Sequence, residues 1–213
     1  GIEVLPARPK SSKAKSYKGN SNNLTEFGAI NPISPDHQIP RDLQKTFISH
    51  AGEDYSTLAL TVISEPFSNV HDHSNSPING FAALQLYNGN KKHIQTVVSD
   101  SGIGIAGSLR PVLADKYPTL QSKFSPKSVY TDVLLIKEVF ENGGISQVYE
   151  EARGLGLNRT FKLAVKYNAN ISIRQECFEL KLFYRNGVLQ NFSSTENLVK
   201  ILGTHFCFDF FLD

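Results

Sequence analysis

The 213-residue sequence lacks the features that identify several common classes of protein. No apolar run approaches the roughly 18 residues of a membrane-spanning helix. The N-terminus has no apolar segment of the kind found in signal peptides. We therefore expect neither a membrane span nor a secretory leader. The formal net charge is only +2 and the isoelectric point is about 8.5, which is too mild to indicate a nucleic-acid partner.

Cysteine is scarce and methionine is absent. The two cysteines, Cys177 and Cys207, do not have the spacing of a metal site, and both fall in strand-like patterns. We expect them to be buried thiols in a reducing cytoplasm rather than partners in a disulfide. Average usage would supply a handful of methionines.

The first part of the chain differs in composition from the rest. Residues 1 to about 45 are rich in Lys, Ser, Asn and Pro and have no hydrophobic periodicity. This predicts a polar arm or linker over residues 1–50, solvated or packed on the surface. Residues 51–213 are expected to form one domain. Lysines in the arm could bind an acidic partner, although a solvated linker is the simpler interpretation.

One stretch, V-V-S-D-S-G-I-G-I at residues 97–105, combines an apolar run, a single carboxylate and two glycines. The apolar start predicts a buried strand. Gly102 and Gly104 allow a sharp turn and a close approach of the backbone to a ligand. Asp100 lies where the strand ends and can accept a hydrogen bond. Taken alone, the pattern also fits an ordinary Asp-Gly turn after a core strand.

A helical pattern begins near Ser56 and contains three polar residues four positions apart. Glu65, Asn69 and His73 would lie on one face of this helix. A solvated polar face is the simplest explanation, since burying such groups without partners costs roughly 1–3 kcal/mol each. Pro66 is unfavourable inside a helix. The helix is therefore expected either to kink there or to start near Ser64.

A second glycine-containing motif, A-R-G-L-G-L, occupies residues 152–157 and opens a helical run over 158–167. Glycines at the start of a helix can present backbone N–H groups to an anion. A flexible loop before an amphipathic helix is the alternative. The alternating patterns elsewhere predict a helix over 131–141 and strands over 81–87, 93–99, 171–176, 178–184, 188–192 and 205–212.

In chain order the motifs read E-x-x-x-N-x-x-x-H-S, D-x-G-x-G-I, R-G-L-G-L and a late Gly-Thr. Together, over residues 55–213, they resemble the Bergerat-fold (GHKL) ATP-binding domain of DNA gyrase, heat-shock chaperone ATPases, histidine kinases and mismatch-repair ATPases. The resemblance implies an α+β two-layer sandwich. Its mixed β-sheet would carry helices on one face, and ATP would lie between the helices and a mobile lid.

The resemblance also implies roles for individual residues. Asn69 would bind Mg²⁺, for which a neutral amide oxygen is suitable beside a triphosphate. Asp100 would accept from the exocyclic amine of adenine, with Thr204 nearby. Glu65 would act as the general base, towards a protein hydroxyl or towards water. The other implied nucleotide-binding residues are His73, Gly102, Gly104, Arg153, Gly154 and Gly156.

Three functions follow from the resemblance. The first is a small cytoplasmic regulatory kinase, similar to stand-alone anti-sigma-factor-type serine kinases, that phosphorylates a partner protein. The second is an ATP-dependent conformational switch, and the third is a nucleotide sensor without turnover. The resemblance leaves both a monomer and a homodimer as alternatives. The chain departs from the family pattern at Ala152, where the lid motif usually has glycine, at Pro66 and at Asn168-Ala169-Asn170.

Overall fold

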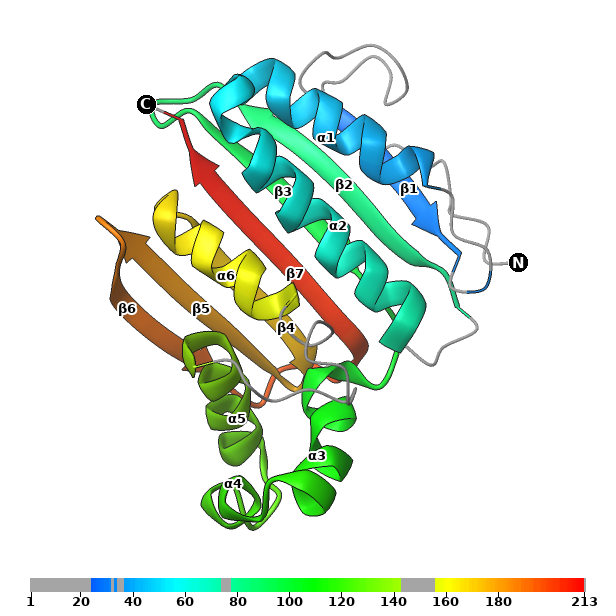
Figure 1. Cartoon of the computed structure of the whole chain (residues 1–213), viewed down its shortest axis with the longest axis vertical. Helices are drawn as coiled ribbons and strands as arrows, with labels where there is room; N and C mark the ends of the chain where they lie inside the picture. The colour runs from blue at the N-terminus through cyan, green and yellow to red at the C-terminus, as the bar shows by residue number, and fades with distance from the viewer. Residues whose placement is uncertain (1–23, 32, 34–36, 74–77, 143–155, 213) are drawn as a thin grey trace.

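The computed structural model describes residues 24–31, 33, 37–73, 78–142 and 156–212. Its centre is a seven-stranded β-sheet. The strands are β1 (Leu24–Ile30), β2 (Gly80–Tyr87), β3 (His93–Ser99), β4 (Asn170–Glu176), β5 (Phe178–Arg185), β6 (Val188–Thr195) and β7 (Ile201–Phe211). They lie in the spatial order β1-β2-β3-β7-β4-β5-β6 (Figure 1).

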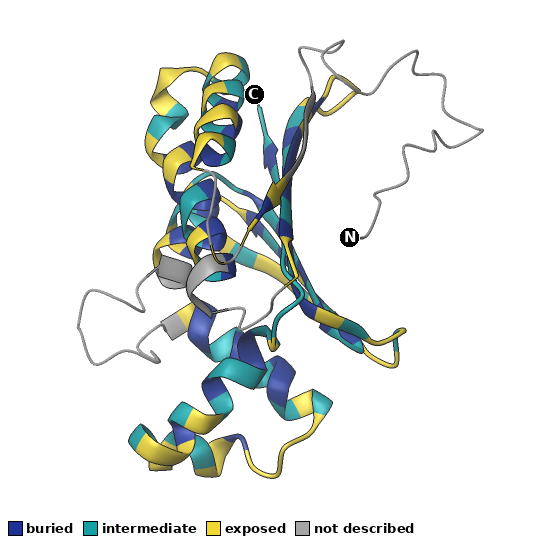
Figure 2. Cartoon of the chain, turned by 90° about the vertical axis from the view of Figure 1, so that its right-hand side faces the viewer, coloured by how far each residue is buried: buried dark blue, intermediate teal, exposed yellow. Residues whose placement is uncertain are grey.

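Helices cover one face of this sheet. They are α1 (Gln38–Ala51), α2 (Ser56–His73), α3 (Gly104–Lys116), α4 (Pro118–Lys123), α5 (Val129–Asn142) and α6 (Gly156–Lys166), with a 3-10 turn, η1 (Glu53–Tyr55), before α2. Seen edge-on in Figure 2, the helices lie on one side of the sheet, and buried residues of both line the space between them. Helices α3, α4 and α5 gather beyond one end of the sheet (Figure 1). No described helix combines the length and the apolar character that a membrane span needs.

Every pairing between neighbouring strands of the described sheet is antiparallel. The expected α+β class is confirmed, but the expected mixed sheet is wrong. The connections β2–β3, β4–β5 and β5–β6 are short hairpins, which can only join antiparallel strands. The last strand, β7, enters the sheet between β3 and β4 and runs opposite to both.

An aromatic row on β7 forms the middle of the core. Phe206, Phe208 and Phe210 alternate along the strand, are buried, and stack with ring centroids 5.9 and 6.0 Å apart. The three share one face of the sheet, because successive residues of a strand point to opposite faces. It is the helix-covered face, since Phe210 contacts a side chain of α1. Phe47 of α1 packs edge-on against Phe210 at 5.5 Å. The first helix is thus anchored on the last strand of the chain.

Residues 24–51 differ from the polar arm expected over residues 1–50. Strand β1 pairs with β2 along the edge of the sheet, and Ile30 at its end is buried. Helix α1 buries Pro40, Leu43 and Phe47 against the core. A few buried side chains, each contributing about 1.5–3 kcal/mol, hold this segment despite its polar composition. The remainder of the expected arm lies outside the described residues.

Two helices continue through a proline. Helix α2 starts at Ser56 with Pro66 inside it, so of the two alternatives the start near Ser64 is wrong. Leu58, Val62 and Phe67 of α2 are among its buried residues. Burial of such a face, at about 1.5–3 kcal/mol per side chain, outweighs the roughly 3 kcal/mol that an internal proline costs. Helix α3 likewise contains Pro111.

The other expected elements are largely confirmed. Helix α5 and all six predicted strands lie within a few residues of their expected bounds. The Asn186-Gly187 pair between β5 and β6 has φ values of 54° and 70°. Both residues therefore adopt the left-handed conformation that a two-residue hairpin of this type requires.

The two cysteines are free thiols, as expected, but both are half-buried rather than buried. Cys207 lies on the sheet face opposite the aromatic row. Its partial burial, together with the nearby Asp209 and Glu179, raises its pKa to about 12. Cys207 therefore stays protonated at neutral pH, and a thiol is a poor nucleophile.

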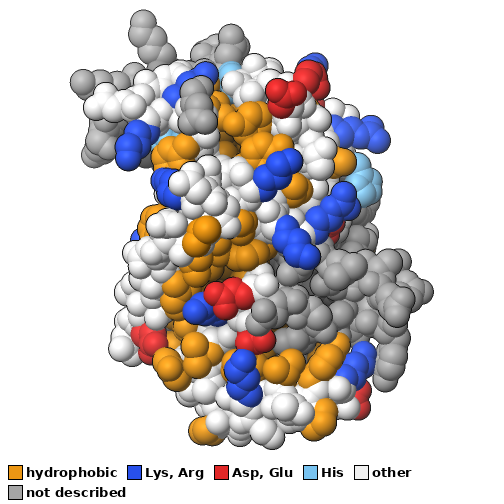
Figure 3. Space-filling view, turned by 60° about the vertical axis from the view of Figure 1, so that its left-hand side comes forward, with side chains coloured by type: hydrophobic (Ala, Val, Ile, Leu, Met, Phe, Trp, Pro, Cys, Tyr) orange, Lys and Arg blue, Asp and Glu red, His pale blue; other side chains and the backbone are white. Residues whose placement is uncertain are grey.

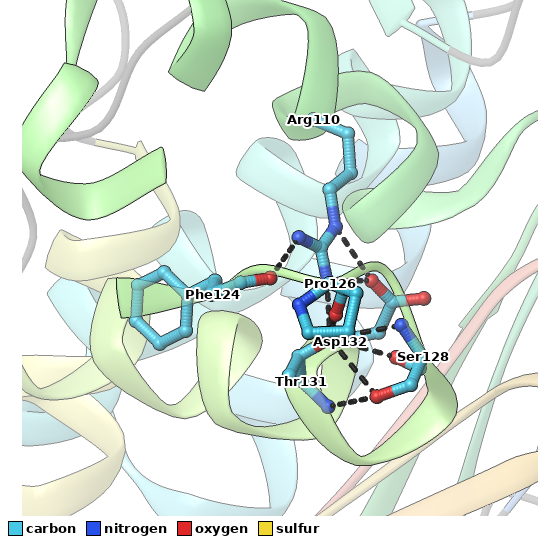
Figure 4. Close-up of polar contacts among 6 residues, drawn as sticks. All are labelled: Arg110, Phe124, Pro126, Ser128, Thr131 and Asp132. Atoms are coloured by element: carbon cyan, nitrogen blue, oxygen red, sulfur yellow. Dashed lines mark hydrogen bonds and ion pairs between the residues drawn. The ribbon is translucent and has the colours of Figure 1, made fainter. Parts of the chain in front are cut away.

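A cluster around Arg110, which we call the Arg110 clamp, ties α3 to the first turn of α5 and to Phe124, just after α4 (Figure 4). The guanidinium donates from Nε to Oδ1 of Asp132 at 2.8 Å, from Nη1 to the carbonyl of Phe124, and from Nη2 to the hydroxyl of Thr131 at 2.7 Å. The Arg110 and Asp132 side chains are each 12% exposed. The backbone N–H of Thr131 in turn donates to the hydroxyl of Ser128, which caps the start of α5.

Charge is dispersed over the face of the molecule shown in Figure 3. Lys and Arg side chains are spread over this face, some of them close together on its right-hand side, and acidic side chains and hydrophobic surface also occur on it. This distribution agrees with the small net charge of the chain.

Candidate functional site

The candidate site lies where β3 ends, in the middle of the sheet. Asp100 follows the last residue of β3, and its backbone N–H donates to the carbonyl oxygen of Thr204 at 2.9 Å. This bond continues the β3–β7 pairing beyond Ser99 and His205. The sequence motif D-x-G-x-G and the late Gly-Thr are thus brought together, as the resemblance implies, although they are about 100 positions apart.

Gly203 allows this close approach of β7 to Asp100. Its φ is +81°, and a Cβ atom there would lie 2.0 Å from the backbone oxygen of Asp100 and 2.7 Å from its Oδ1. Backbone atoms cannot move aside as a flexible side chain can. The position next to Asp100 therefore requires glycine for its space as well as for its conformation.

The carboxylate of Asp100 is held by the turn that follows it. Its Oδ1 accepts a hydrogen bond from the backbone N–H of Gly102 at 2.7 Å. Burial raises the pKa of Asp100, and interactions with the backbone at Gly102 and Thr204 and with His205 only partly oppose this shift. The carboxylate has lost more hydration than its present neighbours replace. A further hydrogen-bond donor at this position would stabilise its charged form.

Gln175 is a part of the site that the sequence motifs did not identify. Its side-chain Oε1 accepts from the backbone N–H of Ile105 at 3.0 Å, at the start of α3. The carboxamide also lies against Gly104, whose missing Cβ would be 3.3 Å from Oε1. A polar signal was present in the sequence. In β4 the core-facing positions read Ile171, Ile173 and Gln175, so an amide takes the place of a third apolar residue.

The last turns of α2 reach the same end of β3. A Cβ on Gly80, at the start of β2, would lie 2.6 Å from the carbonyl oxygen of Ser99 and 2.6 Å from Cγ1 of Val70. Asn69, the residue before Val70, therefore belongs to the helical turn beside the strand end. Glu65 lies one turn earlier, and both side chains are half-buried. His73 is the last residue of α2, but its side chain lies outside the described residues.

The third motif is only partly within the described structure. Arg153 and Gly154 lie outside the described residues. Gly156 is the first residue of α6, and α6 packs against α2. The expected contact of this motif with a phosphate therefore stays a prediction.

A metal ion held by the protein alone would need several ligand side chains close together. In this part of the chain, no group of three or more His, Cys, Asp or Glu side chains could hold a metal ion. A single amide such as that of Asn69 fits Mg²⁺ only where phosphate oxygens and water complete the coordination.

Comparison with known proteins adds no family. No protein-family model matches the chain, and no curated protein matches it in sequence.

Proposed function

We propose that the chain is a Bergerat-type domain that binds ATP with Mg²⁺ at the turn following β3 and phosphorylates a partner protein. The observation that carries the proposal is the position of Asp100. Its incompletely compensated carboxylate lies at the end of a central strand, against Gly203 of the neighbouring strand. A ligand amine would supply the donor that this carboxylate lacks.

Adenine fits this requirement better than guanine does. Adenine presents an exocyclic amine where guanine presents a carbonyl oxygen, and a carboxylate accepts from the amine but repels the carbonyl. A site built around such a bond can reject the analogue lacking it by about 10⁴-fold or more. The proposed ligand is therefore ATP or ADP, with strong discrimination against GTP.

Glu65 and Asn69 support the catalytic part of the proposal. They lie one turn apart on α2, in the half of the helix that reaches the end of β3. Mg²⁺, when bound, would neutralise phosphate charge, and Asn69 would supply one oxygen ligand. The carboxylate of Glu65 would accept the proton of a partner hydroxyl. The hydroxyl oxygen would bond to the γ-phosphorus as ADP departs. The protein partner and a cytoplasmic location stay predictions.

Titration calorimetry with Mg-ATP and Mg-GTP tests the proposal. We expect ATP binding, much weaker GTP binding, and loss of ATP binding in Asp100→Asn. The matched control is Asp209→Asn on β7, which changes a carboxylate that accepts from Gln95 Nε2 on the opposite sheet face. Equal affinity for the two nucleotides would remove the adenine-reading role of Asp100.

Glu65→Ala separates the functions that remain. If the chain is a kinase or an ATPase, this variant should bind ATP with nearly unchanged affinity and lose transfer or hydrolysis. Incubation with γ-labelled ATP, with and without candidate partner proteins, measures both activities. ATP binding without any turnover in the parent protein would instead favour the conformational switch or the nucleotide sensor.

A further inference from the structure

Gln175 carries an unused hydrogen-bond donor in the interior of the protein. Its side chain is only 1% exposed, and its Nε2 has no hydrogen-bond partner among the described residues. Buried polar groups are nearly always paired, so an exception calls for an explanation. An apolar residue, such as Ile171 or Ile173 at the preceding core-facing positions of β4, would avoid the problem altogether.

The orientation of the carboxamide follows from its one bond. The backbone N–H of Ile105 is a donor, and it must therefore face the oxygen of Gln175 rather than the NH₂ group. If the amide were rotated by half a turn, its NH₂ group would face the N–H of Ile105. Two donors would then meet, and the amide oxygen would be unpaired. The bond to the start of α3 thus leaves the NH₂ group as the unpaired end of the side chain.

Gln175 lies on β4, and β7 separates it from Asp100 at the end of β3. Gln175 pairs with Thr204 across β4 and β7, and the carbonyl of Thr204 accepts from the N–H of Asp100. On the other side, the carboxamide lies against Gly104, four residues after Asp100. The start of β7 therefore has a carboxylate acceptor on one side and an amide donor on the other, both incompletely paired.

We propose that Gln175 is a specificity-determining residue, whose Nε2 donates a hydrogen bond to a ring nitrogen of the adenine base that Asp100 binds through its amine. The inference rests on the proposed function. Adenine carries acceptor nitrogens, N1 and N7, on either side of its exocyclic amine. Guanine carries an acceptor in place of the amine and a donor at N1. An acceptor and a donor on the protein together match adenine. The acceptor opposes the guanine carbonyl, and the donor opposes guanine as well where the bonded nitrogen is N1, since N7 is an acceptor in both bases.

The test combines a protein variant with ligands that lack one ring nitrogen each. Gln175→Met keeps the length of the side chain and removes the donor. Nucleotide affinity is measured by calorimetry with ATP, 1-deaza-ATP and 7-deaza-ATP, on folded protein checked by circular dichroism. Gln95→Met is the matched control, because Gln95 lies on the opposite face of the sheet, bonded to Asp209 at 2.8 Å.

We expect Gln175→Met to bind ATP about tenfold or more weakly than the parent does. The parent should lose a similar factor with one of the two deaza analogues, the one that lacks the bonded nitrogen. That same analogue should bind Gln175→Met no more weakly than ATP does, since the bond is already absent. Gln95→Met should bind all three ligands as the parent does.

A loss of the same factor for ATP and both analogues in Gln175→Met would overturn the inference, because it would show that Gln175 only supports the Ile105 turn. Unchanged ATP affinity in the variant would overturn it as well. In either case, selective ATP binding by the parent would leave the proposed function intact. A parent protein that binds no adenine nucleotide would overturn both.

Discussion

Two polar clusters lie along α3, and they differ in how completely their groups are paired. At its start, Asp100 is incompletely compensated and Gln175 has an unpaired donor. Further along, the Arg110 clamp pairs the guanidinium with a carboxylate, a carbonyl and a hydroxyl. Both clusters are substantially removed from water, so their difference lies in the partners supplied by the protein.

This difference indicates two uses of buried polarity. A cluster with complete pairing holds elements in one arrangement, and its loss should appear in stability. A cluster with incomplete pairing lowers stability in the free protein and is retained where a ligand supplies the missing partners. Substitutions in each cluster, with stability and nucleotide affinity measured separately, test this difference between the two clusters.

The largest effect is expected for Gly203→Ala, which would force apart β7 and the Asp100 turn. The new Cβ would lie 2.0 Å from a backbone oxygen, at a φ of +81°. We expect a loss of about 4 kcal/mol or more in the free energy of unfolding. Urea denaturation measures it. Gly187→Ala is the control, since its φ is +70° but its Cβ would meet nothing within 4 Å. It should lose only about 1–2 kcal/mol. Equal losses would show that conformation, not contact, matters at Gly203.

The next effect concerns the clamp. Arg110→Met should lower the free energy of unfolding by about 3 kcal/mol, because it leaves Asp132 buried without its cation. The exposed pair Lys123–Glu138 gives the control. Lys123 is 56% exposed, and Lys123→Met should change stability by less than about 1 kcal/mol. The preference for ATP over GTP should survive in Arg110→Met. Loss of that preference would mean that the clamp also shapes the nucleotide site.

A smaller and opposite effect is expected for Asp100→Asn. Burial raises the pKa of Asp100 above its ordinary value of 3.8, so the folded protein holds this proton more tightly than the unfolded chain does. The parent is therefore penalised at neutral pH, and the penalty disappears as pH falls below 3.8. The variant should gain about 1 kcal/mol at pH 7 and nothing at low pH. Thermal unfolding from pH 3 to pH 8 measures this. A less stable variant at pH 7 would show that the charge supports the fold.

The smallest effect is expected for Tyr184→Phe. The hydroxyl of Tyr184 is buried without a partner among the described residues, and burial raises its pKa. Unlike Gln175, Tyr184 is not one of the residues that form the candidate site. Its removal should be neutral or should raise stability by up to about 1 kcal/mol. Denaturation midpoints suffice to detect it. A clear loss of stability would indicate an ordered water bonded to this hydroxyl.

Local patterns predicted much of the secondary structure from the sequence. The alternation in β3, β4 and β5 and the Asn186-Gly187 turn identified strands and a hairpin nearly at their observed bounds. Patterns failed where burial outweighed propensity. The polar composition of the first 45 or so residues obscured β1 and α1, and Pro66 was expected to kink its helix or to lie in its first turn, whereas α2 starts at Ser56. In each case a few buried side chains provide more free energy than the local preference removes.

For the candidate site, the sequence by itself determined the chemical groups: a carboxylate and two glycines after a strand, a polar stripe on a helix, and a late Gly-Thr. Their periodicity and spacing are local properties of the chain. Only the tertiary structure decided that β7 inserts between β3 and β4, so that Gly203 meets Asp100 and Thr204 pairs with Gln175. Strand order depends on contacts between residues far apart in the chain, which local patterns do not specify. The role of Gln175 emerges from that pairing, because a buried amide becomes informative only when its neighbours are known.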